Sequence, residues 1–122
     1  MKEKILIVDD NKDTLEIISL ILTDSGYEIK CQNHGNRIFE VINEFQPDLL
    51  LMDIMLGLTD GMAICQEIKK NIQYNHLPVI IVSGTYDLEQ SLDLPGAPND
   101  YLAKPFDIEA LLNKVKKHLK AN

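Results

Sequence analysis

Five short apolar runs, separated by segments of helical period, constrain the fold of this chain more than any other feature. The runs are rich in aliphatic and β-branched residues, which favours strands. They span Lys4 to Val8, Tyr27 to Cys31, Asp48 to Met52, Pro78 to Val82 and Asp100 to Ala103. The first, third and fourth are nearly all apolar, as in strands that are covered on both faces. The sequence therefore predicts an α/β fold with a doubly wound parallel sheet.

The segments between the runs have the spacing of amphipathic helices. Helices are expected at Lys12 to Ser25, Asn36 to Phe45, after Asp60 as N-cap, at Tyr86 to Asp93, and after Asp107. The expected core face of the third helix carries Ile64, Ile68 and Ile72, and that of the fifth carries Ile108, Leu111, Leu112, Val115 and Leu119. The fourth is limited to about two turns, because two prolines and a glycine follow it.

Length and composition predict one domain that spans residues 1–122. The apolar runs are too short to cross a membrane, and the run near the N-terminus ends in aspartates, so a secretory signal is not expected and the predicted location is the cytoplasm. The formal net charge of −7 argues against a nucleic-acid surface. Cys31 and Cys65 lack metal-ligand spacing and are interpreted as small core residues.

Polar side chains follow four of the five runs directly. Asp9 and Asp10 follow the first run, Asp53 the third, Ser83 the fourth and Lys104 the fifth. The ligand site of an open parallel sheet lies beyond the carboxyl ends of its strands, so these side chains are expected at one edge. Taken singly, each is more simply a turn, cap or solvated residue. Their common placement favours a shared site.

Such a site needs positive charge. Two carboxylates 4 Å apart repel by roughly 4 kcal/mol at an effective dielectric constant near 20. The ammonium group of Lys104 can offset one charge, and a hard dication with oxygen ligands, such as Mg²⁺, can offset the others. A hydroxyl and an ammonium facing a metal ion suit a phosphoryl group.

Four motifs occur in order along the chain: ILIVDD, LLLMDIML with a later DG, IIVSG and DYLAKPF. In these motifs, and over its whole length, the chain resembles the receiver domain of two-component response regulators. The resemblance implies a flavodoxin-like (βα)5 three-layer sandwich, whose five-stranded sheet has the order 2-1-3-4-5. It also implies a stand-alone phosphoacceptor of a phosphorelay that catalyses only its own phosphorylation and dephosphorylation, and is otherwise not an enzyme.

The resemblance assigns roles to the matching positions. Asp53 corresponds to the phosphoacceptor, which takes a phosphoryl group from a histidine kinase or a phosphotransfer protein. Asp9 and Asp10 correspond to the acidic pair that binds Mg²⁺, together with Asp53 and the main-chain carbonyl of Met55. Lys104 would pair with the phosphoryl oxygens, as phosphoryl transfer requires.

Other matching positions concern switching and partners. Ser83 would donate its hydroxyl to the phosphoryl group, and Tyr101 would rotate into the space that this opens, changing a partner-binding surface. Pro105 matches a cis proline. The expected partners are the phosphodonor protein, a downstream protein target and, weakly, a second copy of the chain, with no direct nucleic-acid or membrane binding.

Three features depart from the family pattern. Gly57 replaces the usual proline four residues after the phosphoacceptor, and Gly84 replaces the commoner alanine; both are expected to add backbone freedom. The segment from Ser83 to Gly96 is shorter than usual, which predicts a reduced fourth helix.

Two other functions remain open at this point. A pseudo-receiver would keep the fold and switch without phosphorylation. A small phosphatase resembling the haloacid dehalogenase family would use an aspartyl-phosphate intermediate, but its second aspartate, two residues after the nucleophile, is Met55 here.

Overall fold

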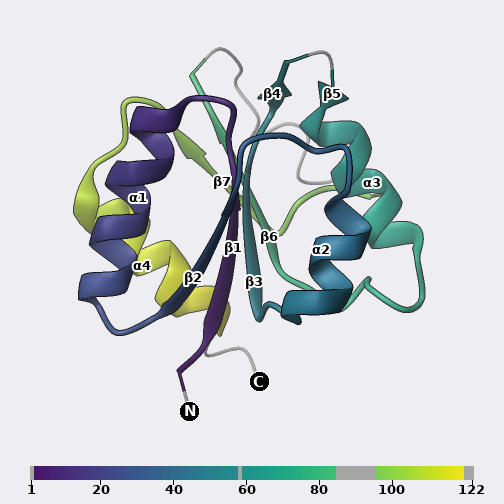
Figure 1. Ribbon diagram of the computed structural model, residues 1–122, viewed down its shortest axis with the longest axis horizontal. Coiled ribbons are helices and arrows are strands. Elements are labelled where there is room, and N and C mark those ends of the chain that lie inside the picture. The colour runs from purple at the N-terminus through teal and green to yellow at the C-terminus, as the bar shows by residue number, and fades with distance from the viewer. Residues whose placement is uncertain (1, 58, 85–95, 120–122) are drawn as a thin grey trace.

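The computed structural model describes residues 2–57, 59–84 and 96–119, and their main feature is one parallel sheet. Its five strands have the order β2-β1-β3-β6-β7 (Figure 1). The bounds are Lys4–Val8 for β1, Glu28–Gln32 for β2, Leu49–Asp53 for β3, Val79–Ser83 for β6 and Asp100–Ala103 for β7. The predicted order is therefore confirmed, with β6 and β7 as the fourth and fifth parallel strands.

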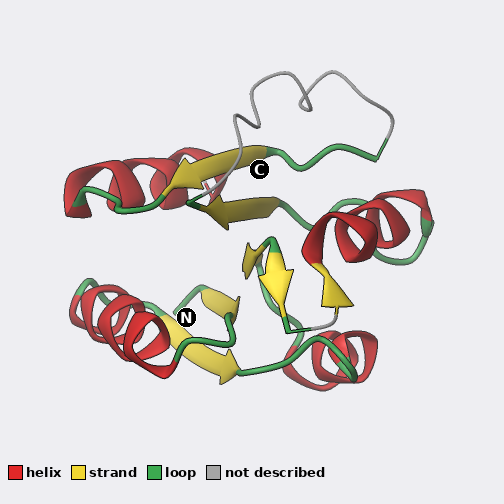
Figure 2. Cartoon of the chain, turned by 90° about the horizontal axis from the view of Figure 1, so that it is seen from above, coloured by secondary structure: helices red, strands yellow, loops and turns green. Residues whose placement is uncertain are grey.

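Helices cover both faces of this sheet. Their bounds are Lys12–Asp24 for α1, Ile38–Phe45 for α2, Gly61–Lys70 for α3 and Ile108–Leu119 for α4. The pair α1 and α4 covers one face, and the pair α2 and α3 covers the other, so that the sheet forms the middle layer (Figures 1 and 2). The three-layer prediction is confirmed. The helix predicted at Tyr86 to Asp93 lies outside the described residues, and α4 corresponds to the predicted fifth helix.

The core is divided by the sheet into two halves. Successive residues of a strand point to opposite faces, so Leu6 packs with α2 and α3 whereas Ile7 packs with α1 and α4. All residues of β3 and β6 are buried, which explains why these runs contain almost no polar residue before their last position. Each large aliphatic side chain buried in this way contributes about 1.5–3 kcal/mol.

The edge strand β2 corrects one sequence-based interpretation. Cys31 lies on β2 and is exposed, so the prediction that it is a small core residue is wrong. Because β2 has a neighbour on one side only, its residues are mostly exposed or half-buried. Cys65 on α3 is buried as expected, and burial raises the pKa of its thiol to about 11.

Two predicted core positions at helix ends are also wrong. Helix α3 ends at Lys70 because Asn71 takes an extended backbone, and Ile72 beyond it is 90% exposed. Ile108 is 54% exposed because it is the first residue of α4 and precedes the buried stripe of that helix. Leu111 and Val115 within the stripe are fully buried, as predicted.

Side-chain caps mark the starts of two helices, α1 and α3. Asn11 accepts hydrogen bonds from the backbone amides of Asp13 and Thr14, and so begins α1. Asp60 accepts one from the amide of Met62 and begins α3, as predicted. None of the helices in the described ranges is long and apolar enough to span a membrane.

A short antiparallel hairpin follows β3 and was not predicted. It consists of β4, Met55–Leu56, and β5, Thr59–Asp60, with Met55 paired to Asp60. The hairpin lies beyond the carboxyl end of β3, next to the start of α3 (Figure 1). It therefore stands beside the edge where the sequence predicts a site.

Candidate functional site

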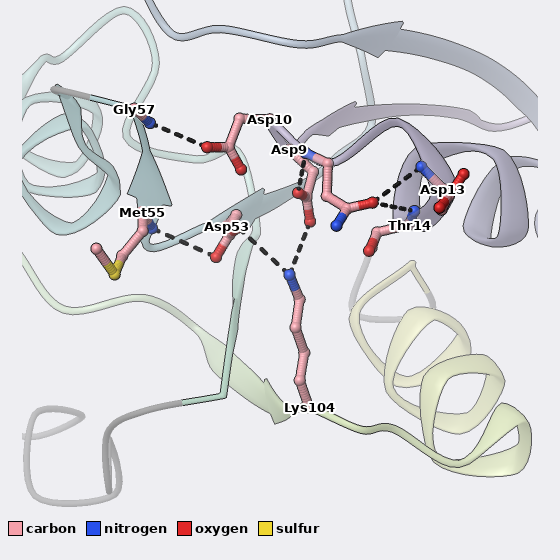
Figure 3. Close-up of polar contacts among 9 residues, drawn as sticks. Asp9, Asp10, Asp13, Thr14, Asp53, Met55, Gly57 and Lys104 are labelled. Atoms are coloured by element: carbon pink, nitrogen blue, oxygen red, sulfur yellow. Dashed lines mark hydrogen bonds and ion pairs between the residues drawn. The ribbon is translucent and has the colours of Figure 1, made fainter.

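Three carboxylates meet at the carboxyl edge of the sheet. Asp9 and Asp10 directly follow β1, and Asp53 is the last residue of β3. The pairing of Val8 with Met52 brings Asp9 level with Asp53 on the neighbouring strand. One oxygen atom from each of the three carboxylates lies within 4.8 Å of the others. The sequence-based grouping of these aspartates is thus confirmed as a geometric fact (Figure 3).

Lys104 reaches into this cluster from the end of β7. Its Nζ lies 3.0 Å from Oδ2 of Asp9 and 3.3 Å from Oδ2 of Asp53 (Figure 3). Burial lowers the pKa of Lys104, but the hydrogen bond and charge of Asp9, together with those of Asp53, outweigh it, so the pKa is raised. Lys104 is therefore a fixed positive charge in the site.

The charge on Asp53 is poorly compensated. Burial and the neighbouring charge of Asp9 raise its pKa, and the opposite effects of Lys104 and of the Met55 amide do not cancel this. Only 8% of Asp53 is exposed, so water screens the charge weakly. One ammonium group against three carboxylates leaves an excess of negative charge.

The donor set fits a hard divalent cation. All three side chains offer carboxylate oxygens, which Mg²⁺ prefers, and their spacing allows one ion to contact each of them. The amide of Met55 donates a hydrogen bond of 3.3 Å to Oδ1 of Asp53, so the main chain of β4 begins beside the cluster.

Gly61 lets the main chain close tightly behind Asp53. Its amide donates a hydrogen bond of 2.7 Å to the carbonyl of Ile54. A Cβ atom at position 61 would lie 2.2 Å from the carbonyl oxygen of Asp53, a separation that no packed structure tolerates. The glycine of the DG motif is therefore required by this contact.

Ser83 and Tyr101 lie where the sequence predicts, on β6 and β7. Asp53 pairs with Val82, so Ser83 is one residue further along the adjacent strand, and it is buried. Tyr101 is half-buried, packs against the half of the core formed with α2 and α3, and lies under Lys114, whose Nζ is 5.8 Å from the ring centroid. The peptide bond between Lys104 and Pro105 is cis.

A second polar cluster was missed by the sequence analysis. Asp100, at the start of β7, is 8% exposed and accepts hydrogen bonds from Lys114 and His118 of α4 at 2.9 and 3.0 Å. Burial raises the pKa of Asp100, but the hydrogen bonds from Lys114, His118 and the Tyr101 amide outweigh it and hold the pKa below its ordinary value. The spacing of Lys114 and His118, one helical turn apart, was the available signal. The cluster attaches α4 to the strand that carries Tyr101.

We expect the contribution of Asp100 to depend on pH. Since its pKa is lowered in the folded state, the carboxylate stabilises the fold above its unfolded pKa of about 3.9, and this stabilisation is lost as the pH falls through the folded pKa. Asp100→Asn should lower the free energy of unfolding at neutral pH by about 1–2 kcal/mol. Urea denaturation should show this difference shrinking below about pH 4.

Glu67→Gln is the control for this experiment, because Glu67 is exposed on α3. Its stability should follow that of the unchanged protein at every pH. A difference between Asp100→Asn and the unchanged protein that stays constant from neutral to acidic pH would show that the carboxylate charge of Asp100 does not stabilise the fold.

Comparison with known proteins identifies the class of this domain. The family model of the response regulator receiver domain matches residues 5–116. The chain is similar to a CheY-like response regulator receiver domain protein from Methanospirillum hungatei, with a TM-score of 0.87 and 29% identity over 98% of this chain and 94% of that one. It is also similar to the BeF3-activated N-terminal receiver domain of RstA from Klebsiella pneumoniae, with a TM-score of 0.85 and 29% identity over 97% and 99% of the two chains.

A third structure shares the fold at lower identity. The chemotaxis response regulator CheY4 of Vibrio cholerae has a TM-score of 0.86 and 22% identity, with coverage of 97% of this chain and 99% of that one. The chain therefore belongs to the response regulator receiver domain family, with the flavodoxin-like fold that the sequence predicts. It is a signalling domain of a two-component system, and the class implies kinase or phosphotransfer partners and effector domains.

Proposed function

We propose that this chain is a phosphoacceptor, in which Asp53 receives a phosphoryl group from a histidine kinase or a phosphotransfer protein in a Mg²⁺-dependent reaction. The observation that carries the proposal is the position of the Asp53 carboxylate. It lies between Lys104 Nζ and the Met55 amide, and beside the carboxylates of Asp9 and Asp10. Few other reactions need a nearly buried carboxylate, an ammonium and an oxygen-lined cation site together.

In the proposed reaction an oxygen of Asp53 attacks the phosphorus of a phosphohistidine. The new bond joins that oxygen to phosphorus, the bond between phosphorus and the imidazole nitrogen breaks, and its electron pair stays on the imidazole. The Met55 amide and Lys104 orient the carboxylate before attack, and Lys104 then pairs with the transferred oxygens. When bound by Asp9, Asp10, Asp53 and the carbonyl of Met55, Mg²⁺ would neutralise charge on those oxygens.

Ser83 and Tyr101 would change position when Asp53 is phosphorylated. The Ser83 hydroxyl would donate to the new phosphoryl oxygens, and Tyr101 would move inward on β7, biasing a surface toward a downstream protein. Lys114 lies over the ring of Tyr101 and also binds Asp100. A movement of Tyr101 would therefore change the contact between β7 and α4. We place the function in the cytoplasm and assign residues 1–122 to one receiver domain, which acts on no substrate beyond its own phosphoryl group.

The direct test uses Mg²⁺ and a small phosphodonor such as acetyl phosphate, followed by intact-mass spectrometry. The unchanged protein should gain one phosphoryl group, and Asp53→Asn should gain none, because the amide is not a nucleophile at this position. Omitting Mg²⁺ should reduce the yield strongly. An adduct that persists in Asp53→Asn would contradict the assignment of the acceptor.

The two alternatives find less support in the site. A pseudo-receiver does not need an assembled site, yet the acidic cluster and Lys104 are all in place. A phosphatase needs a proton donor two residues after the nucleophile, and the thioether of Met55 cannot transfer a proton. Hydrolysis of a generic phosphoester with turnover would restore the second alternative.

A further inference from the structure

Gly57, directly after β4, contacts Asp10 of the acidic pair. The amide of Gly57 donates a hydrogen bond of 3.2 Å to Oδ2 of Asp10 (Figure 3). Gly57 has φ 64, in the left-handed region, and space is open around the position where a Cβ would lie. The sequence predicts that Gly57 adds backbone freedom to this loop, and the structure shows in addition that the glycine bonds the loop to Asp10.

A proline at this position could not make the same contact. Proline has no amide hydrogen and its φ is fixed near −65°, whereas the observed contact needs both an N–H group and a positive φ. The hydrogen bond is therefore a consequence of the residue by which this chain departs from its family.

Each carboxylate of the cluster is held by a backbone amide. Oδ1 of Asp9 accepts from Asn11 at 2.9 Å, and Oδ1 of Asp53 accepts from Met55 at 3.3 Å. In both cases the donor lies two residues after the aspartate that accepts from it. Asp10 differs, because its donor, Gly57, comes from the hairpin that also carries Met55.

Asp10 also needs such a donor most. It is exposed, unlike Asp9 and Asp53, so its side chain would otherwise sample several rotamers. The bond to Gly57 uses one lone pair of Oδ2 and leaves Oδ1 and the remaining lone pairs for a cation. Hydrogen bonds of this kind orient carboxylate ligands, and losing one costs about 10–100-fold in metal affinity.

We propose that the Gly57 amide is a positioning group for Mg²⁺, which fixes the Asp10 carboxylate and holds the Met55 main chain against the acidic pair. This rests on the proposed function, since it concerns the cation of the same site. The bond joins the segment after β4 to the segment after β1. A cation that binds most tightly when Asp10 accepts this hydrogen bond therefore also stabilises the hydrogen-bonded position of the hairpin.

The test compares two substitutions at one position. Gly57→Pro removes the N–H group. Gly57→Asn keeps it, and asparagine tolerates a positive φ better than most residues. Mg²⁺ affinity of the unphosphorylated protein, measured by calorimetric titration, should fall about tenfold in Gly57→Pro and change by less than about threefold in Gly57→Asn. Circular dichroism and melting without Mg²⁺ report whether each variant is folded.

A second measurement does not depend on any variant. In the unchanged protein, hydrogen exchange of the Gly57 amide should be slow for a turn residue, and slower still with saturating Mg²⁺. Equal losses of affinity in both variants, unchanged affinity in Gly57→Pro, or rapid Gly57 exchange with and without Mg²⁺ would each overturn the proposal. Failure of the unchanged protein to bind Mg²⁺ at all would instead reject the proposed function together with this inference.

Discussion

Gly61→Ala is expected to destabilise the protein by about 3 kcal/mol and to suppress phosphorylation of Asp53. The added Cβ would lie 2.2 Å from the carbonyl oxygen of Asp53 and 3.0 Å from Cα of Ile54. Both are main-chain atoms, so no side-chain rotation can relieve the clash. Overpacking of this kind costs about 1–3 kcal/mol, and the upper end applies where backbone must move.

The same movement would displace the reactive group. Asp53 would shift relative to Lys104 and Asp9, and a misplacement of about 1 Å can cost about 100-fold in rate. Urea denaturation measures the first effect, and the rate of adduct formation with acetyl phosphate measures the second. Melting curves should also show whether loss of activity exceeds what the unfolded fraction explains.

Gly84→Ala is the matched control. A Cβ at position 84 would meet the Cβ of Lys104 at 3.4 Å, which is ordinary van der Waals contact, and its backbone φ is not positive. This variant should therefore keep its stability within about 1 kcal/mol. If both alanine variants behaved alike, close packing behind Asp53 would not be the reason for Gly61.

Lys104→Met should reduce phosphorylation of Asp53 by about 10²–10³-fold, because it removes a fixed charge aimed at the transferred oxygens. Methionine keeps most of the aliphatic volume, so the change isolates the ammonium group. Asp9 is 2% exposed and would lose its cationic partner. Removing one member of a fully buried pair costs about 3–5 kcal/mol; the Lys104 side chain is 25% exposed, so a smaller loss of stability is expected.

Three measurements test this prediction: the rate of adduct formation, Mg²⁺ affinity and the midpoint of thermal unfolding. Added Mg²⁺ should restore part of the lost stability, because it supplies positive charge to the same carboxylates. Lys117→Met, at an exposed position of α4, should leave all three unchanged. A Lys104→Met variant that is phosphorylated at the normal rate would remove Lys104 from the proposed mechanism.

The central strands and the main site residues could be predicted from sequence for a physical reason. A parallel strand covered on both faces must be apolar, so the first polar residue after it marks the edge of the sheet. Asp9 directly follows β1, which is such a strand. Lys104 directly follows the edge strand β7, which begins with a polar residue, and was placed with Asp9 because the carboxyl ends of parallel strands meet at one edge of the sheet. The strand ends differ from the prediction: β3 and β6 each begin and end one residue later than predicted, and so include Asp53 and Ser83.

The features that could not be predicted are contacts between residues far apart in the sequence and the exact residue at which a helix ends. The bond from Gly57 to Asp10 joins residues 47 positions apart, and Asp100 meets Lys114 and His118 only after α4 packs on β7. The apolar period of α3 also continues through Asn71 and predicts Ile72 on the core face, although the helix ends at Lys70 and Ile72 is exposed. The local sequence pattern predicts the secondary structure that a segment prefers, but it does not predict which distant residues that segment contacts.

The edge strand β2 has a consequence for association between copies of this chain. An edge presents unpaired backbone groups that can accept another strand, which is a route to aggregation. Glu28 and Lys30 project from the same face of β2, and both are exposed. Charged side chains on an edge strand, lysine in particular, are among the features by which natural sheets resist pairing with another strand. The charges that make this strand weakly apolar therefore oppose the addition of another strand at this edge of the sheet.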